Sequence, residues 1–265
     1  MKQYWLNEQT HQMPQAWREL SDKQVLRLAP YLYADRSDAH SRLAVLKILQ
    51  PQLKEKTLRR MSPEDVLALT NLTEWIWSAP MDQCPVTCFE HQKVRYLLPE
   101  PVFENCVAIE YLMANHHFRQ FARPKPAAGA LELLVATLCR PEKKDLDVLD
   151  PEWDGDRRQK YNSKVTELRA KELATLPVAT KIVVLQYYVA SQRAFHERYK
   201  ELYKKKKPGE RQASAGDFGL LGVVHDVAGE GLFGDFERTC LTNVHTLFFH
   251  LLKGHREAKA QRREG

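Results

Sequence analysis

Apolar residues recur every three or four positions along most of this chain, which is the period of a helix with one buried face. The clearest helix start is at Ser21, where Gln24 completes a capping box and Leu20 is placed to pack on Val25. We expect this helix to end near Tyr33, before the polar run 35–38. Its start is therefore predicted from local signals alone.

The same period predicts helices along the rest of the chain. Pro63 fits the first position of a helix, because the N–H that proline lacks has no helical partner there. The expected helices cover 39–50, 63–80, 103–121, 127–139, 164–173, 177–203, 217–228 and a last one beginning at 238 or 243. We therefore predict an all-α fold, a multi-helix bundle of eight to ten helices.

Residues 80–101 depart from the helical pattern. Four prolines, Pro80, Pro85, Pro99 and Pro101, bracket this part of the chain, and proline interrupts helices. The segment near 85–98 is compatible with either a short hairpin or an extended loop.

Two polar stretches suggest how the chain is divided. Residues 142–162 are predicted to form a long surface loop, and loops of that length are often functional or flexible. Residues 207–216 are predicted to be a flexible linker. We expect a helical body over 1–206, in which 1–100 either belongs to the body or forms a separate lobe, and a C-terminal helical pair over 217–265 that packs on it.

Charge is concentrated in two segments of the 265-residue chain, which carries a formal net charge of +6. Residues 196–211 hold seven bases and three acids, and residues 253–265 hold five bases and two acids. The remainder is close to neutral, which argues against a protein that coats nucleic acid with its whole surface. A hydrophobic content of 43% argues against general disorder.

The location expected from the sequence is the cytoplasm, or a virion. The N-terminal residues lack the apolar core of a signal peptide, and no apolar run reaches the roughly 18 residues of a membrane helix. The five cysteines show no disulfide framework, which is typical of a reducing compartment.

Two motifs suggest metal binding, and neither is complete. Cys84, Cys88 and His91 resemble half of a zinc site but have no matching second pair, so small buried side chains are the alternative we favour. The run 150–156 resembles a calcium-binding loop, but its twelfth position is Tyr161 rather than glutamate. We expect no metal and no cofactor, and a solvated turn anchored by Trp153.

No catalytic constellation can be assembled from the sequence. The glycines of 229–234 have the spacing of a dinucleotide-binding motif, but they join two predicted helices and follow no strand. We expect them to supply positive φ at a helix end. His225 next to Asp226, and His245 with His250, are not spaced to share a helical face. These observations favour a protein that is not an enzyme.

One segment has the composition of a nucleic-acid contact. Lysines neutralise phosphate and tyrosines can stack on bases. The alternative is that lysines at a helix C-terminus complement the helix dipole. The candidate residues are Tyr199, Tyr203, Lys204, Lys205, Lys206, Lys207 and Arg211.

Several short sequence segments between residues 103 and 252 together resemble a group of uncharacterised helical proteins. These proteins are encoded among the tail genes of bacterial phages and prophages. The segments are Phe103–Cys106 with Glu110, Leu134–Pro141, Gly155–Arg158 with Tyr161 and Asn162, Leu176–Pro177, Gly231–Gly234 and Thr242–Asn243. The resemblance implies a role in virion or tail assembly, and it assigns no site residue. Phe218 stands where that group would have tryptophan.

The function expected from the sequence is therefore non-enzymatic: tail assembly, or a minor structural role, through helical protein–protein interaction. Candidate contacts on the last helix are Leu241, Val244, Phe248, Leu251 and Leu252, although packing within their own domain is the commoner use of such residues. Phage structural or assembly proteins are the expected partners. The alternatives are a nucleic-acid-binding accessory protein using 198–211 and, third, a metal-dependent or hydrolytic enzyme.

Overall fold

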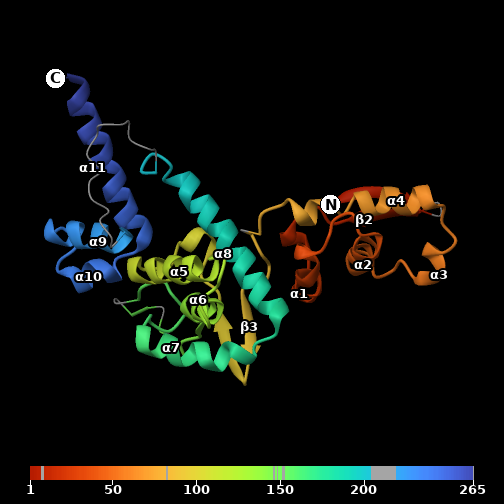
Figure 1. The fold of residues 1–265 in the computed structure, drawn as a ribbon, viewed down its shortest axis with the longest axis horizontal. Coiled ribbons are helices and arrows are strands. Elements are labelled where there is room, and N and C mark those ends of the chain that lie inside the picture. Colours follow the sequence, from red (N-terminus) through yellow and green to blue (C-terminus); the bar gives the residue numbers. More distant parts are fainter. Residues whose placement is uncertain are drawn as a thin grey trace. The chain divides into compact units, whose positions relative to one another are not determined.

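The computed structural model describes residues 1–6, 9–81, 83–145, 147, 149–150, 153–203 and 219–264 (Figure 1). The chain divides into two compact units. Unit 1 comprises residues 1–89 and 176–190, and unit 2 comprises residues 90–175 and 191–265. The C-terminal helices therefore belong with residues 90–175, a division that differs from the boundaries expected from the sequence.

Helices dominate the described residues, as expected. The α-helices are α1 (Asp22–Leu28), α2 (Ala39–Leu49), α3 (Glu55–Leu58), α4 (Pro63–Asn71), α5 (Ala108–Phe121), α6 (Ala130–Leu138), α7 (Ser163–Glu172), α8 (Val178–Arg198), α9 (Gly219–Gly229), α10 (Phe236–Leu241) and α11 (Val244–Glu264). Short 3-10 helices cover Trp17–Glu19, Ala29–Tyr33, Glu74–Trp77, Pro101–Phe103 and Leu173–Thr175.

Two small antiparallel sheets correct the all-α prediction. The first pairs β1 (Lys2–Leu6) with β2 (Gln9–Met13), a hairpin that the sequence analysis did not expect. The second has the order β3 (Cys88–His91), β4 (Val94–Leu97) and β5 (Arg140–Pro141). Of the two alternatives for 85–98, the hairpin is therefore the correct one. Its turn places Gln92 and Lys93 at φ 49° and 65°, and positive φ at both turn residues is typical of tight hairpins.

Helix starts were predicted correctly where the sequence holds a local start signal, and other helix boundaries were predicted less well. Ser21 and Gln24 form the expected capping box, and Pro63 begins α4. The helix expected from residue 103 begins only at Ala108, because Val102 and Phe103 have left-handed backbones with φ of 58° and 66°. Other predicted ends were too long: α4 ends at Asn71 instead of residue 80, and α8 ends at Arg198 instead of residue 203.

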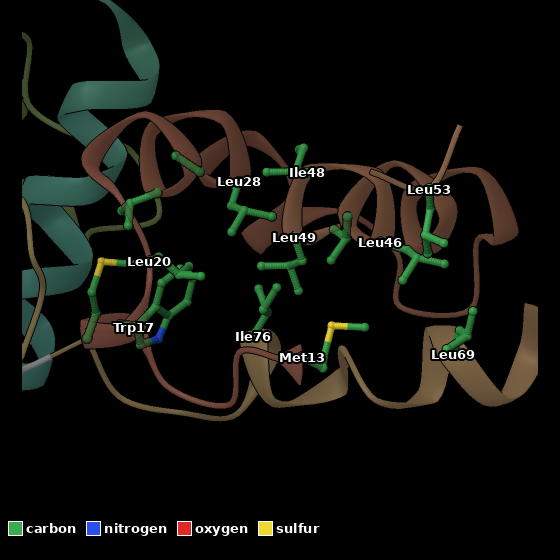
Figure 2. Close-up of a cluster of buried hydrophobic side chains, with 14 of the residues drawn as sticks. Met13, Trp17, Leu20, Leu28, Leu46, Ile48, Leu49, Leu53, Leu69 and Ile76 are labelled. Atoms are coloured by element: carbon green, nitrogen blue, oxygen red, sulfur yellow. The ribbon is translucent and has the colours of Figure 1, made fainter. Parts of the chain in front are cut away.

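Unit 1 is built around a core of aliphatic and aromatic side chains from its hairpin and helices. Met13, Leu46 and Leu49 are buried there with Trp17 and Ile76, and Figure 2 shows Leu49 and Ile76 pointing toward each other. Burying one such aliphatic side chain stabilises a fold by about 1.5–3 kcal/mol. The core therefore holds the N-terminal hairpin against α2 and the 3-10 helix Glu74–Trp77.

A buried amide also ties this hairpin to α2. The Gln50 side chain is buried, donates to the carbonyl of Gln12 at 2.7 Å and accepts from the Tyr4 hydroxyl at 3.0 Å. A buried amide is stable only when its polar atoms are paired. The sequence pattern does not show this pairing, since the partners lie far apart in the chain.

Unit 2 has an aromatic core and a helical cluster around α5. Phe103, Tyr111, Phe195, Tyr199 and Phe248 contact one another with ring centroids 4.6–6.2 Å apart. Helices α9, α10 and α11 pack on α5 through a cluster that comprises Ala108, Leu112, Val224, Val227, Cys240 and Leu247. The N-terminus of α5 and the N-terminus of α11 are joined by backbone bonds from Ala108 to Thr242 and from Val244 to Cys106.

The remaining predictions concern a glycine turn, a linker and the absence of a membrane-spanning helix. Gly231 and Gly234 have φ of 73° and 89°, which confirms that the glycine run supplies positive φ at a turn between two helices. The predicted linker 207–216 and the first two positions of the helix predicted over 217–228 lie outside the described residues. Among those that are described, no helix combines the length and the apolar character that crossing a membrane requires.

Candidate functional site

The basic segment predicted as a nucleic-acid contact is only partly described. Lys204–Lys207 and Arg211 lie outside the described residues. Tyr199 is 5% exposed, its ring packs in the aromatic core and its hydroxyl lies 2.9 Å from Nδ1 of His245. The prediction that Tyr199 stacks on a base therefore does not fit the structure. Tyr203 is partly exposed, with its ring 4.5 Å from that of His196.

Most of the predicted protein contacts on the last helix are used inside unit 2. Val244, Phe248 and Leu252 are buried, and Leu251 packs against the cluster around α5. These four residues stabilise their own domain and do not offer a free surface. Leu241 differs, because it is 59% exposed.

The most unusual feature of unit 2 is a buried network of two arginines and two carboxylates. Glu110, Arg140 and Arg158 have side chains at most 2% exposed, and Asp156 is nearly as buried. Arg158 Nη1 donates to Glu110 Oε1 at 2.7 Å, and Arg140 Nη2 donates to Glu110 Oε2 at 2.7 Å and to Asp156 Oδ2 at 2.8 Å. The formal charges of these four groups balance.

Hydrogen bonds to neutral groups add to the network. The Asn105 amide donates to Asp156 Oδ1 at 3.2 Å, and Arg158 donates to the carbonyl of Leu138 at 2.9 Å. Burial alone would lower the pKa of Arg158, but the charge of Glu110 and then its other partners raise it well above the usual value. Arg158 is therefore held in its charged form inside unit 2, and removing one of its buried partners would be strongly destabilising.

This network fixes the chain segments that carry a basic surface. Arg140 Nη1 donates to the carbonyl of Gln159 at 2.7 Å. Backbone bonds then join Gln159 to Pro141 at 2.8 Å and Lys143 to Arg157 at 2.8 Å, while Glu142 bonds to Arg95 at 3.1 Å. Residues 157–159 thus lie alongside 141–143, next to the β3–β4 hairpin. The predicted surface loop 142–162 is anchored in the interior at Asp156 and Arg158.

A pocket of about 890 Å³ is lined by residues of these paired segments, of the β3–β4 hairpin and of α7. Its lining carries six cationic side chains and two carboxylates; the cations are Lys93, Arg95, Lys143, Lys144, Arg157 and Arg169, and the acids are Glu142 and Glu172. Tyr96 and Arg169 are the buried members of this lining. The pocket is therefore positively charged, and one of the arginines that line it is buried.

Arg169 is a buried cation without an ion pair among the described residues. It is 5% exposed, and its Nη1 donates to the carbonyl of Ala136 at 3.2 Å. Burial is the main cause that lowers the pKa of Arg169, yet a guanidinium stays protonated at neutral pH. Buried charges in proteins are normally paired, because an unpaired one loses its hydration without compensation.

Some of the cations that line the pocket form ion pairs with carboxylates, and others do not. Glu142 pairs with Arg157 and lies 3.6 Å from Arg95, while Lys143 pairs with Asp154 at 3.0 Å. Lys93 and Lys144 are exposed and make no ion pair with any described residue. Together with Arg169 they leave three cations of the pocket available to an anion.

The predicted metal motifs do not form a site in the described part of the chain. There, no group of three or more His, Cys, Asp or Glu side chains is arranged to hold a metal ion. Burial raises the pKa of the Cys84 thiol to about 12, so it is not a thiolate at neutral pH. Within the predicted turn, Asp154 and Asp156 are paired with Lys143 and with arginines, respectively. Lys143 Nζ lies 5.0 Å from the ring centroid of Trp153, the predicted anchor.

Comparison with known proteins found no relative of this chain. No family model matches the chain, and neither a curated protein nor a solved structure was found to be similar to it. The resemblance to phage tail-cluster proteins therefore stays a prediction.

Neither Arg169 nor the pocket around it was predicted from the sequence. Arg169 stands in a short helix that was predicted correctly, at a position that a charge pattern alone reads as solvent-facing. The signal in the sequence is the spacing of Thr166, Arg169 and Ala170, which places them on one face of a helix. The structure shows that this face is buried. A lone arginine on an otherwise small, buried face is a candidate for a buried cation.

Proposed function

We propose that this protein is a non-enzymatic nucleic-acid-binding protein and that the basic pocket of unit 2 holds phosphate groups of the ligand. One observation carries the proposal: Arg169 is a buried guanidinium with no ion pair among the described residues, and it lines a pocket of net positive charge. A phosphate oxygen would supply the missing partner. This is the alternative function predicted from the sequence, placed at a different site.

The chemistry of the pocket matches phosphate recognition. Guanidinium groups bind phosphate through two parallel hydrogen bonds, and lysines add charge without fixed geometry. Lys93 and Lys144 are exposed at the rim, so they can approach the phosphate without a large desolvation cost. Such contacts give binding that weakens strongly as salt concentration rises.

The test is the affinity for a short single-stranded oligonucleotide, measured by fluorescence anisotropy at low salt. In the double variant Lys93→Gln/Lys144→Gln we expect the affinity to fall at least about tenfold, since two charge-assisted contacts are lost. Lys171→Gln is the matched control, because Lys171 is an exposed lysine of α7 that does not line this pocket. Wild-type protein that does not bind the oligonucleotide would contradict the proposal.

A third variant separates the pocket from the basic run predicted earlier. Replacing Lys204–Lys207 by glutamine removes that run and leaves the pocket intact. Binding that is lost in this variant and kept in Lys93→Gln/Lys144→Gln would move the site to 204–211. We expect the opposite ranking.

A second candidate function is virion or tail assembly through protein contacts, as predicted from the resemblance. Apolar residues exposed on the C-terminal helices favour it: Leu241 is 59% exposed and Phe249 is 65% exposed. Most phenylalanines of soluble proteins are buried, so an exposed one is a candidate contact.

The corresponding test is co-purification from a host that carries the phage genes, with bound proteins identified by mass spectrometry. We expect a phage structural protein whose recovery falls in Leu241→Ser/Phe249→Ser and not in Leu67→Ser, a control on another exposed leucine. Recovery that is equal in all three proteins would contradict this candidate.

A further inference from the structure

We infer that the basic pocket takes a terminal phosphomonoester of a nucleic acid, a phosphorylated strand end, rather than an internal phosphodiester. This inference rests on the function proposed above and specifies which phosphate the pocket recognises. It starts from the burial of Arg169, since the other cations of the lining are half-buried or exposed.

The depth of Arg169 favours a strand end. The residue is 5% exposed, and its Nη1 already donates to the backbone carbonyl of Ala136. A phosphate must therefore enter the pocket to reach the remaining N–H groups. An internal phosphate carries a nucleoside on each side, so a strand would have to enter and leave the same pocket, whereas a terminal phosphate carries one nucleoside only.

The size of the pocket supports the same conclusion. Its volume of about 890 Å³ is in the range of pockets that hold a single small molecule. One part of the lining is apolar and exposed: Val94, Val165 and Leu168 lie next to the cations. The pocket thus offers charge to a phosphate and an apolar wall to the attached sugar or base.

The charge of the pocket fits a phosphomonoester better than a diester. A phosphomonoester carries about −1.5 to −2 charges at neutral pH, while a diester carries about −1. Three cations without an ion pair among the described residues, Lys93, Lys144 and Arg169, are opposed by the nearby carboxylate of Glu172. A dianion therefore compensates more of the excess positive charge of the lining than a monoanion does.

The experiment compares four versions of one short single-stranded oligonucleotide. One pair bears 5′-phosphate or 5′-hydroxyl with a fluorophore at the 3′ end, and the other bears 3′-phosphate or 3′-hydroxyl with the fluorophore at the 5′ end. Each is titrated with the full-length protein, with Lys93→Gln/Lys144→Gln, with Arg169→Met and with the control Lys171→Gln.

We expect one phosphorylated end to bind at least about tenfold more tightly than its hydroxyl counterpart, because it adds charge-assisted hydrogen bonds. This difference should persist in Lys171→Gln and disappear in the two pocket variants. The exposed lysine pair keeps the test informative if Arg169→Met does not fold.

Two other outcomes overturn the inference and differ in what they leave standing. Equal binding of all four oligonucleotides, weakened in the pocket variants, would reject the strand end and keep the proposed nucleic-acid function. A failure of every oligonucleotide to bind the wild-type protein would reject both.

Discussion

Arg158 and Glu110 lie 48 residues apart in the chain, and their side chains meet at 2.7 Å with neither more than 1% exposed. Glu110 stands in the first turn of α5, where the helix dipole also favours a carboxylate. Arg158 belongs to the segment 157–159, which is hydrogen-bonded to β5 and contributes Arg157 and Gln159 to the lining of the basic pocket. This pair therefore couples the start of a core helix to the geometry of the candidate site.

Removing the charge of Glu110 should destabilise unit 2 strongly. In Glu110→Gln two guanidinium groups remain buried with a single carboxylate, and breaking a buried pair of this kind typically costs about 3–5 kcal/mol. The measurement is hydrogen–deuterium exchange of α5 at increasing urea, which reports on unit 2 separately from unit 1. Glu167→Gln, at an exposed carboxylate of α7, should leave the exchange unchanged. A loss below about 1 kcal/mol in Glu110→Gln would show that the network is not essential.

Acid should weaken unit 2 through His117. Burial, and then the charge of His116, lowers the pKa of His117 from 6.5 to about 4. Between these values the unfolded chain binds a proton that the folded chain does not, so the stability contribution is complete above pH 6.5 and falls as the pH drops to about 4.

Unfolding midpoints measured across this pH range test that linkage. His117→Gln should show a shallower fall in midpoint than the wild type, while His225→Gln, at an exposed histidine of α9, should follow the wild type. Parallel curves for the wild type and His117→Gln would contradict the account.

Because the backbone at Val102 is left-handed, a glycine variant at this position should be more stable than an alanine variant. With φ of 58°, a β-branched residue is strained there, and only glycine adopts this region without a Cβ penalty. Val102→Gly and Val102→Ala both remove the side chain, so their comparison isolates the backbone. We expect the glycine variant to be more stable by about 1 kcal/mol in urea unfolding, opposite to the usual order. Equal stabilities would mean that the backbone relaxes.

The parts of the fold that were predicted correctly depend on neighbours in sequence. The Ser21 capping box, the proline at the start of α4 and the positive φ of Gly231 and Gly234 involve contacts within a few residues. The N-terminal hairpin was missed because it is held by Gln50 and Met13, whose packing joins distant segments. The start of α5 was missed because Val102 and Phe103 depart from helical geometry.

The candidate site shows the same division. The segments that resemble phage tail-cluster proteins contain Asn105, Glu110, Arg140, Asp156 and Arg158, and the structure brings these five residues together in the buried network. The sequence placed no function on them, since residues up to 53 positions apart have no visible relation before the chain folds. Arg169 was missed for a similar reason, because its burial depends on packing against α6.

The dependence of oligonucleotide affinity on salt tests the central claim most directly, since it counts the phosphate charges that the pocket neutralises. For a single strand, the slope of log K against log salt concentration changes by about 0.7 for each contact. We predict that Lys93→Gln/Lys144→Gln lowers the magnitude of the slope by about 1.4, while Lys171→Gln keeps the wild-type slope. A double variant with the slope and affinity of the wild type would contradict nucleic-acid binding in this pocket.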